Sequence, residues 1–305
     1  MKIYFFGTPR FAVPCLKALA LDPFFDIEGV ITMTSKKGDR NTLAEPAIKE
    51  AAEKLDLPVI QKDKIDKELI DEIKKNKPDC IVVVAYGGII PKELIKLPRL
   101  GCINVHPSLL PLYRGASPVQ EALLNGDEDT GVSIMKIDEQ LDHGAIFLIR
   151  RYPIEKDENC EQLLEKLAIK SAELLPFALR DIENEILEPI KQNDAKATFC
   201  RKIEKEDGLL DFNKKTEELI NKIRALNPWP STYTTISGKT LKILGAKSSE
   251  NNSKEKPGNP VLIDKNTFGF KTKDGLLVPT LLQLEGKKPM PAKDFLNGYK
   301  NLLFK

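Results

Sequence analysis

Residues 101–120 read GCINVHPSLLPLYRGASPVQ, and the predicted fold extends outward from them. The apolar run Cys102–Val105 predicts a short buried strand whose end carries Asn104 and His106. Residues two apart on a strand point to the same side, so an amide donor and a titratable imidazole lie together. The segment PSLLP that follows is too rich in proline for a helix and too apolar for a solvated loop, which predicts the wall of a pocket.

Short apolar runs alternate with amphipathic stretches before this segment. Such alternation predicts an α/β fold, a Rossmann-like and mostly parallel sheet with helices on both faces. The loops after parallel strands gather at one edge of the sheet, where folds of this class bind ligands. The predicted strands are 3–6, 27–32, 58–60, 80–85 and 102–105, and the predicted helices are 12–21, 44–55 and 67–74.

A glycine-rich turn follows the most apolar of these strands, 80–85. It reads Tyr86-Gly87-Gly88-Ile89, and its two glycines permit a close approach of the backbone to a ligand. A tight connection from strand to helix is an equally good explanation of the same residues. The polar loop 34–42, TSKKGDRNT, is by composition a surface loop, although at a ligand-binding edge its cations would grip phosphate.

Two further strands, 130–137 and 145–152, flank the acidic loop Asp138–Gly144. A carboxylate placed beside His106 would orient its imidazole and raise its pKa, and the loop offers two, Asp138 and Asp142, either of which could also be only a turn-forming residue. Each member of the trio also has an ordinary structural explanation. Asn104 alone would cap a turn, His106 alone would be a satisfied buried histidine, and Asp142 alone would be a turn residue.

The charge of the chain is divided unequally. Residues 1–190 contain 25 basic and 32 acidic residues, a net charge of −7, whereas residues 191–305 contain 22 and 13, a net charge of +9. We expect a catalytic domain over 1–190, a linker over 191–207 and a small C-terminal β-barrel, OB-like, over 208–305, where short strands alternate with glycine and asparagine turns. The basic half either binds a polyanion or is simply a lysine-rich solvated surface.

Composition argues against several classes of protein. The chain has two histidines and five scattered cysteines without CxxC spacing, so neither a metal site nor a disulfide framework is predicted. It has no apolar run long enough to span a bilayer and no signal peptide at its start. We therefore expect no membrane partner and a cytoplasmic location.

Five segments in order carry a resemblance to a known family. They are FFGTPRFAVPCLKAL, VVVAYGGIIP, INVHPSLLPLYRGASPVQ, TGVSIMKIDEQLDHGAI and IRALNPWP, and together they cover essentially the whole chain. In them the chain resembles the methionyl-tRNA formyltransferase family of folate-dependent formyltransferases. The resemblance implies an enzyme of translation initiation that transfers the formyl group of 10-formyltetrahydrofolate to the initiator methionyl-tRNA, without a tightly bound cofactor or metal.

The resemblance also implies roles for particular residues. The catalytic set is Asn104, His106 and Asp142, while tRNA contact falls to Lys36, Lys37 and Arg40 in a basic loop that is shorter than is usual in the family. Arg114 follows the pocket loop and would grip the acceptor end of the tRNA or pair with an acid. His143 receives no role. The residues expected against the folate are Tyr86, Gly87, Gly88, Ile89, Ser108, Leu109, Leu110, Pro111 and Leu141.

Formyl transfer needs a neutral amine, a stabilised oxyanion and a route for the amine proton. Asn104 and an N–H of His106 would donate to the oxygen as it gains charge, while Asp142 would hold the imidazole and collect the proton. Two other functions remain open at this point. One is a formyltransferase for a small amine such as an amino sugar nucleotide, and the other is a non-catalytic nucleic-acid-binding protein.

Overall fold

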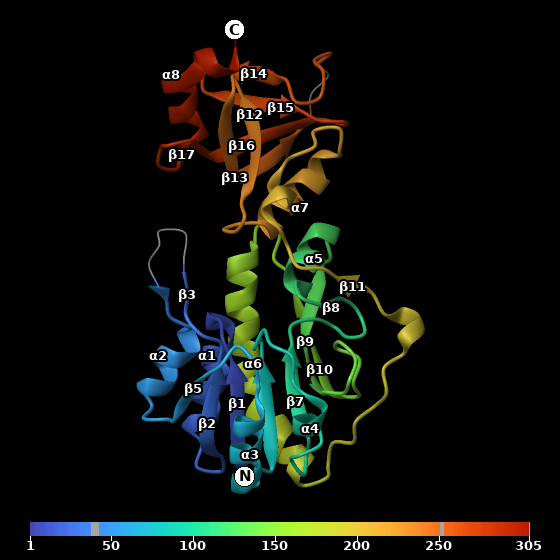
Figure 1. Cartoon of the computed structure of the whole chain (residues 1–305). Coiled ribbons are helices and arrows are strands. Elements are labelled where there is room, and N and C mark those ends of the chain that lie inside the picture. Colours follow the sequence, from blue (N-terminus) through green and yellow to red (C-terminus); the bar gives the residue numbers. More distant parts are fainter. Residues whose placement is uncertain (38–42, 251–252, 305) are drawn as a thin grey trace. The chain divides into compact units, whose positions relative to one another are not determined.

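The computed structural model describes residues 1–37, 43–250 and 253–304, and the chain in it forms two compact units (Figure 1). The first unit comprises residues 1–115, 130–153 and 164–199, and the second comprises 116–129, 154–163 and 200–305. Both are therefore assembled from segments that are separated in the sequence. The division into domains at residues 190 and 208 stays a prediction.

A seven-stranded sheet forms the centre of the first unit, in the order β10-β9-β7-β6-β1-β2-β5. Strands β7, β6, β1, β2 and β5 run parallel, and β9 lies antiparallel to β7. The predicted mostly parallel α/β fold is confirmed. The strands of the unit are β1 (Lys2–Gly7), β2 (Asp26–Thr32), β3 (Lys36–Lys37), β4 (Leu43–Ala44), β5 (Val59–Gln61), β6 (Cys80–Val84), β7 (Cys102–His106), β8 (Arg114–Gly115), β9 (Asp129–Lys136) and β10 (Ile146–Pro153).

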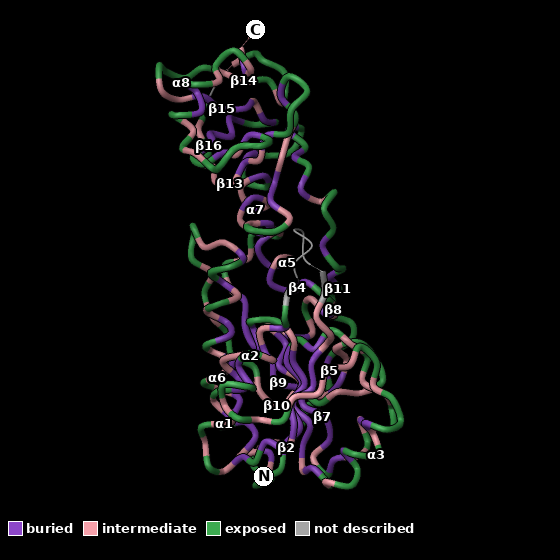
Figure 2. Tube along the Cα trace, turned by 60° about the vertical axis from the view of Figure 1, so that its left-hand side comes forward, coloured by how far each residue is buried: buried purple, intermediate pink, exposed green. Residues whose placement is uncertain are grey.

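Helices cover both faces of this sheet, as the tube in Figure 2 shows by the buried strands at its centre. On one face, Leu69 and Ile73 of α3 and Leu94 of α4 pack on Tyr4 and Phe6 of β1. On the other, residues of α1 and α6 are fully buried. The helices are η1 (Arg10–Ala12), α1 (Val13–Ala20), α2 (Ala47–Glu53), α3 (Lys67–Asn76), α4 (Lys92–Ile95), α6 (Cys160–Glu183) and η2 (Asp194–Lys196).

Local chemistry explains where these helices begin and end. Asp66 caps α3, because its carboxylate accepts a hydrogen bond from the Leu69 N–H at 3.0 Å, and Lys77 ends the helix with a φ of 48°. The helix predicted over 44–55 is shorter than expected, since α2 begins only after Pro46. A residue that precedes proline disfavours the helical conformation, and Pro46 itself has an extended ψ of 129°.

The second unit contains an antiparallel sheet in the order β12-β13-β16-β15-β14, with β17 beside β16. Its core includes aromatic and aliphatic side chains from the sheet, Leu219 and Ile223 of α7, and Phe295 and Leu296 of α8. The predicted C-terminal β domain is confirmed, whereas α5 and α8 had not been predicted. The elements are α5 (Pro118–Asn125), β11 (Phe199–Cys200), η3 (Lys205–Gly208), α7 (Thr216–Ala225), β12 (Thr232–Ile236), β13 (Lys239–Ser249), β14 (Pro260–Asp264), β15 (Thr267–Lys271), β16 (Leu276–Leu284), β17 (Met290–Pro291) and α8 (Ala292–Leu303).

None of the helices within the described residues combines the length and the apolar character that a membrane crossing requires.

Candidate active site

The carboxyl end of β7 carries two of the three predicted catalytic residues. Asn104 and His106 pair with Met135 and Ser133 of β9, so both lie two residues apart on one face of the sheet. Asn104 is half-buried, and among the described residues its amide has no hydrogen-bond partner. His106 is buried. An amide with unused donors beside an imidazole is the arrangement that the sequence predicted.

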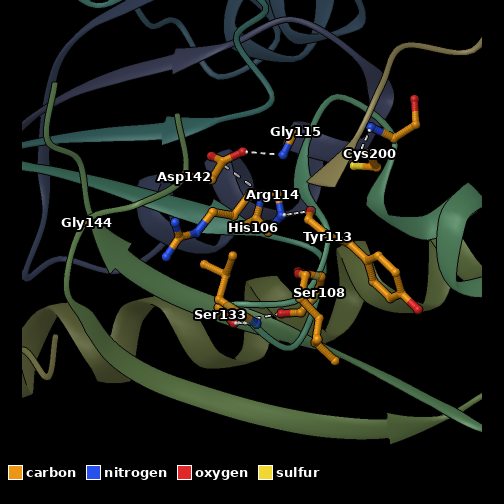
Figure 3. A network of polar contacts seen from close by, with 12 residues as sticks. His106, Ser108, Tyr113, Arg114, Gly115, Ser133, Asp142, Gly144 and Cys200 are labelled. Atoms are coloured by element: carbon orange, nitrogen blue, oxygen red, sulfur yellow. Dashed lines mark hydrogen bonds and ion pairs between the residues drawn. The ribbon is translucent and has the colours of Figure 1, made fainter. Parts of the chain in front are cut away.

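Asp142 reaches this strand end from the loop between β9 and β10. Its Oδ2 accepts a hydrogen bond from the Gly115 N–H at 2.9 Å, and its Oδ1 lies 3.8 Å from Nδ1 of His106 (Figure 3). The residue adopts a φ of 47°, in the left-handed region that few non-glycine residues occupy. Such conformations persist only where surrounding contacts hold them, so the position of this carboxylate is set by its neighbours.

The second nitrogen of the imidazole determines the tautomer. Nε2 of His106 lies 3.0 Å from the carbonyl oxygen of Tyr113. Because a carbonyl only accepts hydrogen bonds, Nε2 carries a proton, and Nδ1 is the nitrogen that faces Asp142. The 3.8 Å between Nδ1 and Oδ1 is too long for a direct hydrogen bond. It is short enough for the carboxylate to stabilise a positive charge on the imidazole when a proton is added.

The predicted pocket loop, residues 107–112, is fastened by buried hydroxyl groups. The Ser108 hydroxyl donates to the Leu112 carbonyl at 2.6 Å, so it is engaged within its own loop. Ser133 of β9 accepts from the Leu110 N–H at 3.1 Å and donates to the Ser108 carbonyl at 2.7 Å. Ser108 and Ser133 have no exposed surface and Leu110 is also buried, whereas Leu109 and Pro111 are half-buried.

The turn after β6 lies where the strand order reverses, between β1 and β6, which is the usual ligand crevice of an open α/β sheet. The Thr8 hydroxyl, after β1, donates to the Tyr86 carbonyl at 2.6 Å and joins the two turns. Burial raises the pKa of the Tyr86 phenol, which donates to the Lys62 carbonyl at 3.0 Å. Gly87 has a φ of 85° with open space beside it, and Ile89 is 91% exposed.

Arg114 is buried rather than presented to solvent. Its guanidinium donates to Oε1 of Gln192, from Nε at 3.0 Å and from NH2 at 2.8 Å, and to Oδ1 of Asp194 at 2.8 Å. Of the two functions expected for Arg114, the pairing with an acid is observed. A contact with tRNA stays a prediction.

Most of the basic loop that was expected to contact tRNA lies outside the residues that the structure describes. Lys36 and Lys37 form β3, which pairs with β4, and Arg40 lies outside the described residues. Their role stays a prediction. His143, which had received no role, lies with Nδ1 2.6 Å from Asp138 and Nε2 3.5 Å from Asp194.

Sequence reasoning missed two residues that organise the site, Ser133 and Gln192. Ser133 sits in a strand of alternating pattern, and the pairing of its strand with β7 is what brings it beneath the pocket loop. Gln192 lies in a charged segment without periodicity. The sequence carries no signal for either role.

Within the described residues, no cluster of three or more His, Cys, Asp or Glu side chains is arranged to hold a metal ion. All five cysteines are buried thiols. Burial raises the pKa of Cys102, at the start of β7, to about 12, so this thiol is not a nucleophile near neutral pH.

Comparison with family models shows two matches. Residues 1–179 match the model described as formyl transferase, and residues 202–300 match the model described as formyl transferase, C-terminal domain. Together these cover most of the chain.

Curated relatives match over nearly the full length. A methionyl-tRNA formyltransferase of Caldicellulosiruptor saccharolyticus is 41% identical over 305 residues, which span 98% of this chain and 97% of the relative. Identity of this extent over both compact units relates the whole chain to those enzymes.

Solved structures at lower identity share the fold. An N-formyltransferase of Helicobacter canadensis, in complex with folinic acid and dTDP-3-aminofucose, has a TM-score of 0.68 at 20% identity and covers 92% of this chain and 98% of its own. HypX of Aquifex aeolicus, in complex with tetrahydrofolic acid, has a TM-score of 0.62 at 19% identity over 97% of this chain. This chain spans about half the length of HypX, 47%.

Proposed function

The chain belongs to the methionyl-tRNA formyltransferase family, and on that premise we propose that Asn104, His106 and Asp142 carry out its reaction. The enzyme transfers the formyl group of 10-formyltetrahydrofolate to the α-amino group of initiator methionyl-tRNA. The observation that supports the assignment of residues is the convergence of His106 and Asp142, with Nδ1 and Oδ1 3.8 Å apart at the carboxyl end of β7. Sugar-amine formylation is not favoured, because the relatives at about 40% identity are named for methionyl-tRNA.

The reaction begins with attack of the amine nitrogen on the formyl carbon. The electron pair of the carbonyl moves to its oxygen, and the C–N10 bond of the folate breaks when that pair returns. Asn104 has amide protons without a partner among the described residues, and it donates to the oxygen as negative charge develops. Loss of such a donor costs about 10²-fold or more in rate.

His106 and Asp142 manage the proton. An aminoacyl α-amino group titrates at or below about 8, so much of it is neutral and no strong base is needed. After the attack, the nitrogen carries a proton that Nδ1 of His106 accepts, because Nε2–H is held by the Tyr113 carbonyl. The imidazolium is balanced by the Asp142 carboxylate and returns the proton to the departing N10 of the folate.

The folate is assigned to the two loops that flank this strand end. Ile89, in the turn after β6, is 91% exposed, and Leu141, which directly precedes Asp142, is 68% exposed. Covering such side chains with an aromatic ligand gains about 25 cal/mol per Å² of apolar surface. Gly87 has open space beside its backbone, whereas the ring of Tyr86 fills the space beside Gly88. The loop from Ser108 to Pro111 is assigned to the other side of the ligand.

The tRNA is assigned to the basic regions of the chain. Residues 191–305 have a net charge of +9, so counterion release drives their attraction to phosphate and weakens it as salt rises. Lys36, Lys37 and Arg40 remain the candidates for the acceptor end. Because charged tRNA is used where translation takes place, the proposal puts the enzyme in the cytoplasm.

Purified protein with 10-formyltetrahydrofolate tests this function directly. The acceptors are methionyl initiator tRNA, methionyl elongator tRNA and an amino sugar nucleotide. We expect formylation of the initiator at a kcat/KM at least about 100-fold above that of the other two acceptors. Preference for the sugar nucleotide would refute the tRNA assignment, and a fully active His106→Ala variant would refute the catalytic assignment.

A further inference from the structure

Residues 190–199, hereafter the strap, run alongside the candidate active site instead of leaving it. At its start, Ile190 and Ile146 exchange two backbone hydrogen bonds of 2.8 Å. At its end, the Thr198 carbonyl accepts a hydrogen bond from the Arg114 N–H at 2.9 Å, and the Thr198 hydroxyl accepts one from the Tyr113 N–H at 2.8 Å. The strap is thus fixed to the Asp142 side of the site and to the loop whose Tyr113 carbonyl holds His106.

Gln192 is the residue of the strap that joins these two sides. Its carboxamide is buried, with 6% of the residue exposed. Nε2 donates to the carbonyl of Asp142 at 2.9 Å and to that of Gly144 at 2.8 Å, while Oε1 accepts two hydrogen bonds from Arg114. All four hydrogen-bonding positions of an amide are therefore used, two on each side.

These contacts bear directly on the Asp142 carboxylate. Asp142 adopts an uncommon backbone conformation, and Gln192 holds its carbonyl. On the other side of the residue, the carboxylate is held by Gly115, which follows Arg114 in sequence. Asp142, Gln192, Arg114 and Gly115 thus form one closed ring of contacts, and it holds the carboxylate whose Oδ1 lies 3.8 Å from Nδ1 of His106.

A second chain of contacts supports the same ring. Oδ1 of Asp194, in the strap, accepts a hydrogen bond from the Arg114 guanidinium at 2.8 Å. The other oxygen, Oδ2, lies 3.5 Å from Nε2 of His143, and Nδ1 of His143 lies 2.6 Å from Oδ2 of Asp138. The hydrogen bond with Arg114 lowers the pKa of Asp194 most, and His143 lowers it further. Both ends of the loop that carries Asp142 are tied to the strap in this way.

We propose that Gln192 is a positioning residue for formyl transfer, which acts by holding the Asp142–Gly144 backbone so that the carboxylate faces His106. The inference rests on the proposed function for the reaction that it serves. Gln192 itself touches no reacting atom. An amide is required because the site needs two donors towards the carbonyls and an acceptor towards the guanidinium, and no other side chain of this length supplies both.

Two substitutions at this position separate positioning from simple packing. Gln192→Glu keeps the acceptors for Arg114 and places a carboxylate oxygen against the Asp142 and Gly144 carbonyls. Gln192→Met keeps the length without polar groups. The matched control is Gln283→Glu in the second unit, where the side-chain amide likewise donates to a backbone carbonyl, that of Lys287, at 2.9 Å.

Two readouts are measured on the full-length protein, steady-state kinetics with both substrates and hydrogen exchange of the Gly115 amide. We expect both Gln192 variants to lose about 10- to 100-fold in kcat, the effect of an ångström-scale displacement, with KM for 10-formyltetrahydrofolate changed less than about threefold. Protection of the Gly115 amide should fall in both variants and remain unchanged in Gln283→Glu.

Wild-type kcat and unchanged Gly115 protection in the folded Gln192 variants would overturn the proposal. If Gln192→Glu fails to fold, Gln192→Met decides by the same two measurements. Formyl transfer by the wild-type protein is the internal reference. Its absence would count against the proposed function, while the exchange of the Gly115 amide would still show whether Gln192 holds Asp142.

Discussion

Replacing Ser133 by alanine removes the hydroxyl that fastens the pocket loop to the sheet. This hydroxyl accepts from the Leu110 N–H at 3.1 Å and donates to the Ser108 carbonyl at 2.7 Å, and the side chain has no exposed surface. In the variant both backbone groups lose a partner at a place that water does not reach. Each unsatisfied group costs about 1–3 kcal/mol, so we expect Ser133→Ala to lower the free energy of unfolding by about 2–6 kcal/mol.

A matched serine provides the control. Ser171 is equally inaccessible, and its hydroxyl donates to the Leu167 carbonyl at 2.7 Å within α6. That carbonyl is also the regular acceptor of a backbone N–H in the helix, so Ser171→Ala leaves no backbone group without a partner. We expect a loss below about 1 kcal/mol. Urea denaturation of both variants and of the wild type gives the comparison.

The same substitution affects ligand binding as well as stability. Leu110 and Ser108 belong to the loop assigned to the folate, so a loosened loop should raise KM for 10-formyltetrahydrofolate more than it lowers kcat. Ser171→Ala should leave both constants unchanged. Equal stabilities of the two variants would refute the reasoning, because the hydrogen bonds of Ser133 would then contribute no more than a redundant one within a helix.

Three further outcomes are expected. Alanine at Asn104, His106 or Asp142 should each lower kcat about 10²-fold or more, and the Asn104→Ala/His106→Ala double variant should lose less than the product of the single losses, which steady-state kinetics will show. Gly144→Ala would place a Cβ 1.8 Å from the Lys136 carbonyl oxygen, so thermal unfolding should detect a lower Tm and the assay a lower kcat. At pH 9 the Cys102 thiol, whose pKa burial raises to about 12, should react with iodoacetamide about 500-fold more slowly than the same thiol in urea, where the ordinary value of 9.0 applies.

The sequence by itself determined the fold class and most of its elements. The apolar run Cys80–Val84 identifies a strand because it is buried along its whole length. The strand β9 was predicted from an alternation of apolar and polar residues, although the structure buries every residue of it except the two at its ends. The same reasoning placed His106 at a strand end and Asp142 on a nearby loop. It overestimated the length of α2, because Pro46 disfavours a helical conformation in the residue before it and the helix begins only at Ala47.

Only the tertiary structure decided how the loops around that strand end are held. Gln192 is 50 residues from Asp142 and 78 from Arg114, and Ser133 is 23 from Leu110. No local pattern encodes a polar contact across such separations, since a glutamine in a charged segment has the same appearance whether it is solvated or buried. The physical reason is that hydrophobic periodicity reports which side of an element is buried, whereas hydrogen-bond partners are set by the packing of elements against one another.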